Sequence, residues 1–104
     1  MADEGKFELV LCIANAGFSQ SIMEVARAAG ARGGTIVRGR GSANPEAEEF
    51  FNITIHPDKE LILILVSSAI KDAVLQAIYK EGGLAREAQG IAFSLPVERT
   101  TLEM

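Results

Sequence analysis

The sequence predicts an α+β fold in which two helices cover one face of a single antiparallel sheet. Three observations predict it. The chain repeats itself, each half reads as a strand followed by a helix, and a β-rich run follows each helix. At 104 residues the chain has the length of one domain, and we expect residues 1–104 to form it. Two tandem strand–helix–strand units build the split βαβ sandwich known as the ferredoxin-like fold.

The repeat becomes visible when residues 8–31 are laid over residues 60–83. Each copy reads as an apolar strand, a short polar turn, a helix and a terminal glycine. The identical pairs are Glu8/Glu60, Leu9/Leu61, Leu11/Leu63 and Gly30/Gly82.

Both helices are predicted from one-sided apolar stripes at helical spacing. We expect Ser19 to cap the first helix, and Ser67 or Ser68 to cap the second. Gly30 and the Gly82–Gly83 pair are predicted to end them, because glycine takes positive φ freely. The stripes are Phe18, Ile22, Val25, Ala26 and Ala29 in the first helix, and Ile70, Val74, Ala77 and Ile78 in the second.

The remaining strands are predicted from β-rich runs at residues 35–37 and 91–97, an alternating run at 51–55 and a continuous apolar run at 61–66. A turn is expected at residues 56–59. Residues 41–49 contain glycine, proline, three glutamates and no large apolar side chain. Such a segment cannot offset the entropy of being ordered, so we expect a short mobile loop at about residues 41–50.

Composition narrows the function classes. The formal net charge is −4, which argues against a broad nucleic-acid surface, because phosphate binding needs a basic face. The longest apolar run, residues 61–66, is far too short to span a membrane. No charged-then-apolar leader opens the chain. We expect a cytoplasmic protein that is not inserted in a membrane.

Groups for catalysis or metal binding are sparse. His56 is the only histidine and precedes a proline in the expected turn, which indicates a solvated residue. Cys12 lies within an apolar strand, where a free cysteine acts as a small hydrophobic residue. One cysteine and one histidine do not make a structural zinc site. The glutamates at 46, 48 and 49 read as a solvated acidic run, so we predict no enzymatic activity, no catalytic residue and no metal site.

Two segments rich in glycine and arginine are the candidates for anion binding. Residues 33–41 end at the expected loop and carry Arg38 and Arg40, while residues 82–90 join the second helix to the last strand. Glycine lets backbone N–H groups approach phosphate oxygens, and arginine offers forked donors. Because the pseudo-two-fold symmetry of the fold separates the two segments within a subunit, we expect self-association to bring them together.

From Phe7 to about Arg99 the chain resembles the PII-type nitrogen-regulatory signal proteins. The resemblance rests on GARGGTIVRGRG (residues 30–41), FNITIHPDKELILILV (51–66) and GIAFSLPVE (90–98). It implies a homotrimer of ferredoxin-like subunits, with an adenine nucleotide as effector in the clefts between them. A loop after the second strand would dock onto a target protein such as a membrane transporter or a metabolic enzyme.

The resemblance also implies roles for individual residues. Thr35 would face the adenine, Gly39 and Gly41 would form the base of the target-binding loop, and Gln89 and Gly90 would belong to a phosphate-binding loop. The loop residues we expect to contact a partner are Ser42, Asn44, Glu46, Glu48 and Glu49.

The chain departs from the family at its cationic positions. Gly90 is followed by Ile91 where the family has a lysine, and Arg99 is the only C-terminal arginine. The loop is shorter than in other members and has no tyrosine for modification. We therefore expect Arg38, Arg40 and Arg86 to replace the lost charge in a divergent PII-like protein, with AMP, ADP or ATP as effector.

The two arginines of the 33–41 segment are expected to point to opposite sides of an extended chain. We choose Arg40, which is nearer the loop, as the arginine that reaches the ligand together with Arg86.

A second function remains open. It is that of the CutA-type trimeric proteins, which share this architecture. In that case the chain would be linked to a metal and bind no nucleotide. The residues that support this alternative are His56, Cys12 and the loop glutamates.

Overall fold

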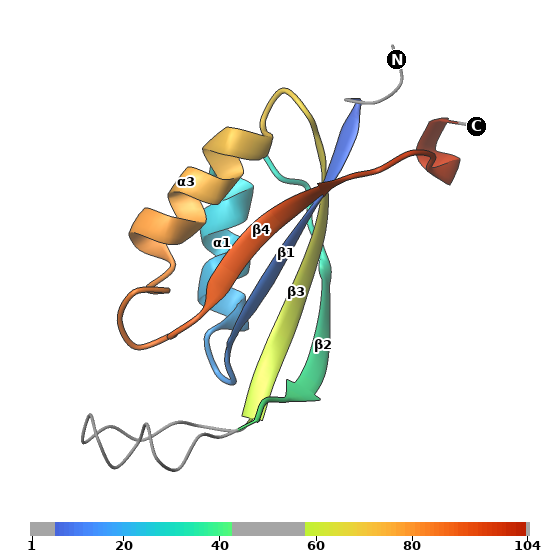
Figure 1. The fold of residues 1–104 in the computed structure, drawn as a ribbon. Coiled ribbons are helices and arrows are strands. Elements are labelled where there is room, and N and C mark those ends of the chain that lie inside the picture. The colour runs from blue at the N-terminus through green and yellow to red at the C-terminus, as the bar shows by residue number, and fades with distance from the viewer. Residues whose placement is uncertain (1–5, 43–57, 104) are drawn as a thin grey trace.

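The computed structural model describes residues 6–42 and 58–103. The sheet has the strand order β2-β3-β1-β4, and all three neighbouring pairs are antiparallel. Both helices cover the same face of this sheet (Figure 1), so the predicted α+β, ferredoxin-like architecture is confirmed. The elements in chain order are β1 (Phe7–Asn15), α1 (Ser19–Ala28), β2 (Thr35–Arg40), β3 (Asp58–Ser67), α3 (Lys71–Glu81), β4 (Ile91–Pro96) and a 3-10 turn at Thr101–Glu103.

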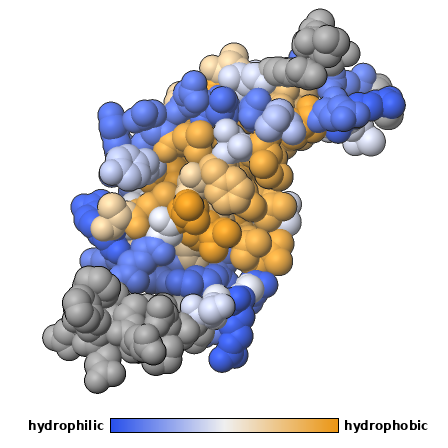
Figure 2. All heavy atoms as spheres, in the orientation of Figure 1, coloured by the Kyte–Doolittle hydropathy of each residue, from blue (hydrophilic) through white to orange (hydrophobic). Residues whose placement is uncertain are grey.

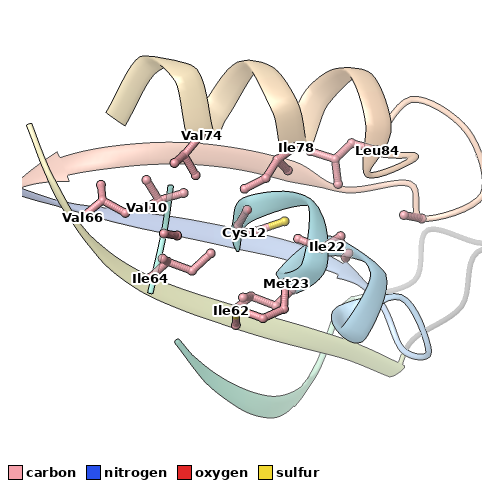
Figure 3. Packing of buried hydrophobic residues seen from close by; sticks show 14 residues of the cluster. Val10, Cys12, Ile22, Met23, Ile62, Ile64, Val66, Val74, Ile78 and Leu84 are labelled. Carbon is pink, nitrogen blue, oxygen red and sulfur yellow. The ribbon is translucent and has the colours of Figure 1, made fainter. Parts of the chain in front are cut away.

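The core lies between the helices and the two central strands. Alternate residues of β1 and β3 are fully or almost fully buried, as the period of a strand requires. They meet the apolar stripes of α1 and α3, whose side chains point toward the sheet (Figure 3). The predicted placement of Cys12 in the core is confirmed. The main buried residues are Val10, Cys12, Ala14, Ile62, Ile64 and Val66 from the strands, with Ile22, Met23, Ala26, Val74 and Ile78 from the helices.

The predicted helix starts are wrong, whereas the predicted ends hold. Ser19 is the first residue of α1 rather than its cap, and neither helix has a side-chain cap hydrogen bond. Ser19 instead bonds to the Glu60 carboxylate, and the Ser67 hydroxyl accepts from the Ala69 amide at 3.2 Å. Both helices end just before the predicted glycines, where the backbone takes positive φ: +116° at Gly30 after α1 and +77° at Gly83 after α3.

Pairing with neighbouring strands lengthens two strands beyond their sequence signals. β2 continues to Arg40, because this residue still pairs with Asp58 of β3. Asp58 and Lys59 were expected in a turn, but they begin β3, since Lys59 also pairs with Asn15 of β1. The predicted strand at 51–55 and most of the predicted loop lie outside the described residues.

The face of the sheet that carries no helix is also apolar. Antiparallel sheets usually present polar side chains on the face away from the core, but here every strand contributes apolar residues to it. Figure 2, in the same orientation as Figure 1, shows hydrophobic side chains gathered over the middle of the molecule, with hydrophilic ones above and below. We call the face of the sheet that carries no helix the open face. Cross-strand register assigns to it Leu9, Leu11, Ile13, Val37, Leu61, Leu63, Leu65, Ile91, Phe93 and Leu95.

Within residues 6–42 and 58–103, no helix is long and apolar enough to cross a membrane.

Candidate functional site

The connection between α3 and β4, residues 83–90, is a compact loop held from inside. Leu84 and Ala88 are buried and fasten it to the core. The amides of Arg86 and Ala88 both donate to the Gly83 carbonyl, at 2.9 and 3.0 Å. The Gly90 amide donates to the Leu84 carbonyl at 3.0 Å. These bonds fix the backbone, while the side chains of Arg86, Glu87 and Gln89 remain exposed.

The end of this loop has an unusual backbone. Gln89 has φ of +46° and is the one non-glycine residue with positive φ among those described, a conformation that L residues avoid unless their surroundings impose it. A Cβ at Gly90 would collide with the Ile13 carbonyl oxygen, so only glycine fits there. In the described part of the chain, the amides of Glu87 and Gln89 donate to no protein acceptor. Turn amides of this kind can bind an anion.

At the second candidate segment, β2, the two arginines share a side. Residues two apart in a strand lie on the same face, and Arg38 and Arg40 lie on the face of Ile36, which packs against the core. The expectation that they point to opposite sides is therefore wrong. Thr35 and Gly39 lie on the open face, with Thr35 exposed.

Gly41 and Ser42 follow β2, and Gly41 lies against the Lys59 side chain. Ser42 is exposed. The other predicted partner-binding residues, Asn44, Glu46, Glu48 and Glu49, lie outside the described residues.

The two segments lie at the same end of the sheet but on its opposite edges, with β3 and β1 between them (Figure 1). Asn15 and Lys59 occupy this intervening position, and the sequence interpretation did not select either of them. Lys59 Nζ donates to Asn15 Oδ1 at 2.7 Å, and Asn15 Nδ2 donates to the Glu87 carbonyl at 3.2 Å. The available signal was a polar residue, Asn15, at the end of an apolar strand.

Glu60 fixes the turn between β1 and α1, which reaches this same end of the sheet. Its carboxylate accepts from the Gly17 amide at 2.9 Å, and Gly17 takes φ of +102° to make the turn. This backbone hydrogen bond, with further bonds from Ser19 and the charge of Arg38, lowers the pKa of Glu60 below its usual value.

A groove of about 690 Å³ lies between α3 and β4, beside the 83–90 loop. Its wall is mainly apolar, and its polar groups are Asp72, Gln76 and Tyr79. It shares Leu84, Ala85 and Gly90 with the loop. No sequence pattern indicated this groove, because it forms only when the helix packs beside the edge strand.

The described residues give little support to a metal site. No group of three His, Cys, Asp or Glu side chains gathers anywhere in residues 6–42 or 58–103. Burial raises the pKa of the Cys12 thiol to about 11, so the thiolate that a metal needs is disfavoured. His56 and the loop glutamates of the CutA-type alternative lie outside the described residues.

Solved structures with the same fold cover nearly the whole chain. A PII-like signalling protein from Thermus thermophilus superposes with a TM-score of 0.68 at 22% identity, over 91% of this chain and 89% of the other. The chain has the fold of PII-like signalling proteins. PII of Arabidopsis thaliana, bound to citrate, gives a TM-score of 0.68 at 24% identity, over 90% of this chain and 77% of the other. GlnK of B. subtilis, in complex with ATP, gives 0.66 at 17% identity, over 93% and 86%.

No family profile and no curated protein sequence matches the chain. The likeness is therefore one of fold, and residue roles in this chain depend on its own geometry.

Proposed function

We propose that this PII-like chain is a non-enzymatic cytoplasmic regulator that senses an adenine nucleotide and controls a target protein. In this proposal three copies form a homotrimer, and AMP, ADP or ATP binds in the clefts between subunits. The segment at residues 41–50 contacts the target, a membrane transporter or a metabolic enzyme. No nucleic acid takes part.

The observation that carries the proposal is the 83–90 loop. It combines an exposed arginine, a left-handed glutamine and two backbone amides without a protein acceptor among the described residues, on a backbone held by internal hydrogen bonds. Such a loop needs little reorganisation to accept phosphate oxygens, and preorganised donors bind charge more strongly. One of the structural neighbours was solved as an ATP complex, which supports an adenine nucleotide as the ligand.

The open face supports the homotrimer. A contiguous apolar surface on a small soluble domain marks an interaction site, and Ile91 is 59% exposed on it. If three sheets turn this face toward a common axis, their edge strands β2 and β4 approach each other. Each cleft would then have β2 of one subunit on one side and the 83–90 loop of the next on the other.

Within such a cleft the residues divide into two walls. We assign Thr35, Gly39, Arg40 and Gly41 to the β2 wall, and Arg86, Gln89 and Gly90 to the loop wall of the neighbouring subunit. Arg38 lies on the same face of β2 as Arg40, opposite to Thr35 and Gly39, and we place it beside Arg40 in this wall. The arginines replace the lysine that follows the loop glycine in the PII-type proteins.

Regulation then depends on differential affinity. A nucleotide can shift the target-binding segment only by the difference between its affinities for the two states of that segment. Acid–base catalysis is not part of the proposal.

The test is isothermal titration calorimetry with ATP, ADP, AMP and cyclic AMP, accompanied by thermal shift. We expect at least one of them to bind the wild-type protein, and Arg86→Gln to weaken that binding about tenfold or more, because a charge-assisted hydrogen bond is lost. Arg27→Gln is the matched control, an exposed arginine in the last turn of α1. Absence of heat and of any thermal shift with all four nucleotides would remove the sensing function.

A further inference from the structure

We propose that Asn15 is a positioning residue that couples the 83–90 loop to Lys59, so that the loop and Lys59 move as one unit. The link runs through the interior of one subunit, between the loop and the start of β3. Its consequence for nucleotide binding rests on the proposed function, whereas the coupling itself does not.

Asn15 is almost fully buried, at 3% exposure, and its backbone amide, side-chain nitrogen and side-chain oxygen each form a hydrogen bond. Its backbone amide donates to the Ala88 carbonyl at 2.8 Å, and its side-chain Nδ2 donates to the Glu87 carbonyl at 3.2 Å. Two successive loop carbonyls are thus drawn inward by one residue. Because the peptide unit is planar, holding these carbonyls also fixes the direction of the amides that follow them.

The other end of the Asn15 side chain meets Lys59. Lys59 Nζ donates to Asn15 Oδ1 at 2.7 Å, a short charge-assisted bond. Lys59 pairs with Asn15 on one side and with Gly39 of β2 on the other. Its aliphatic stem lies against Gly41, where an added Cβ would come within 3.1 Å of the Lys59 Cε atom. Lys59 therefore contacts the last described part of the β2 segment.

The two bonds of the Asn15 amide depend on each other. Its oxygen can only face the ammonium group, and its nitrogen can only face the carbonyl, because the reverse orientation would oppose donor to donor and acceptor to acceptor. Removing Lys59 leaves a buried amide oxygen without its partner, and the side chain is then free to turn away from Glu87. A change at Lys59 is therefore transmitted to the Glu87 carbonyl of the loop through a single side chain.

A neighbouring bond reinforces the same junction. The Ala16 amide donates to the Asp58 carbonyl at 3.0 Å, so Asp58 and Lys59 are both tied to the end of β1. The end of β1 is in turn tied to the loop through Asn15. Among the described residues, this junction is a direct hydrogen-bonded route from β3 to the 83–90 loop.

Amide hydrogen exchange on the protein without nucleotide tests the coupling. Lys59→Met removes the ammonium group and keeps the aliphatic stem. We expect about tenfold faster exchange at the Ala88 and Gly90 amides, because local opening of the loop becomes easier. Exchange at Val10, in the same strand as Asn15, should stay unchanged. Lys80→Met, on an exposed lysine of α3, is the matched control.

Asn15→Asp separates the two ends of the link. The variant keeps an oxygen for Lys59 but replaces the donor to Glu87 by a second acceptor. We expect the loop amides to exchange faster while the Lys59 ammonium stays bound, as judged by its 15N NMR signal. Unchanged exchange at Ala88 and Gly90 in Lys59→Met would overturn the coupling, even if the Asn15 variants fail to fold.

A double-mutant cycle on nucleotide affinity tests the consequence. ADP dissociation constants are measured by calorimetry for Asn15→Leu, Lys59→Met and the double variant. If Asn15 carries the coupling, each single change weakens binding about tenfold and the double variant loses little more, since both break the same link. Additive losses would contradict the role of Asn15. If the wild-type protein binds no nucleotide, the proposed function fails, and the exchange experiment still decides the coupling.

Discussion

At the scale of the residue, Glu60 shows how a side chain from one strand fixes a turn that belongs to another. Its carboxylate accepts from the Gly17 amide and holds a glycine at positive φ. The folded protein therefore favours the charged form, which is why the pKa of Glu60 lies below its ordinary value of 4.5. The stabilisation is complete above that ordinary value and is lost as the pH falls through the lower folded-state pKa.

Glu60→Gln should therefore destabilise the protein in a pH-dependent way. At pH 7 we expect the free energy of unfolding to fall by about 1 kcal/mol, because a neutral amide oxygen accepts the Gly17 hydrogen bond less strongly than a carboxylate does. The difference from wild type should shrink as the pH is lowered through the folded-state pKa, because the wild-type carboxylate then takes up its proton. Urea unfolding at several pH values measures this difference in the free energy of unfolding. Glu24→Gln, on the exposed side of α1, is the control. A difference that stays constant with pH would contradict this role.

Gly90 provides a second residue-scale prediction. A Cβ at this position would collide with the Ile13 carbonyl and lie 3.0 Å from Leu84 Cδ2. Gly90→Ala should therefore lower the free energy of unfolding by about 1–3 kcal/mol, as overpacking does. Gly33→Ala is the control, because no heavy atom lies within 4 Å of its added Cβ. Equal effects of the two substitutions in urea unfolding would refute the close approach.

At the scale of the element, local signals predicted the helices well and their starts poorly. The stripe through Ile22 and Ala26 is a property of the helix itself, and it becomes the buried face. A serine near a helix start is an ambiguous signal, because its hydroxyl can bond elsewhere. Ser19 bonds to Glu60, a residue distant in sequence that no local pattern could connect with it.

Strand lengths and the candidate site also depend on contacts between residues that are distant in the sequence. β2 continues to Arg40 because β3 is there to pair with it, although it contains Gly39, and glycine is a weak strand former. The glycine and arginine residues of the 83–90 loop were recognisable from the sequence. The Asn15–Lys59 bond was not, since it joins two strand ends that only the sheet register brings together.

The shared face of Arg38 and Arg40 leads to a prediction for β2 as an element. If both arginines face the cleft, Arg38→Gln and Arg40→Gln should each weaken nucleotide binding. The loss should be larger for ATP than for AMP, because more phosphate charge is left uncompensated. Calorimetry with both nucleotides measures it, and Arg27→Gln is again the control. A loss confined to Arg40→Gln would show that only one arginine of this face reaches the ligand.

At the scale of the whole molecule, the sheet is apolar on both faces while helices cover only one. The covered face holds the residues at 3% exposure or less, such as Ile62 and Ile64, whereas the alternate residues of the same strand are only half-buried. Sequence periodicity could not separate these two faces, because β3 reads as an unbroken apolar run. An apolar face that no helix covers is typical of a surface that packs against another molecule, which supports the proposed trimer.

The last prediction concerns this assembly. Leu63 lies at the centre of the open face, paired with Leu11 of β1 and Thr35 of β2. Leu63→Glu should leave each subunit folded, because the side chain is not part of the helix-covered core, and should break the trimer by placing charges in an apolar interface. Light scattering after gel filtration should then give one third of the wild-type mass, with circular dichroism unchanged. Ala28→Glu, on the exposed side of α1, should remain trimeric. A folded Leu63→Glu protein of unchanged mass would mean that the subunits do not associate through this face.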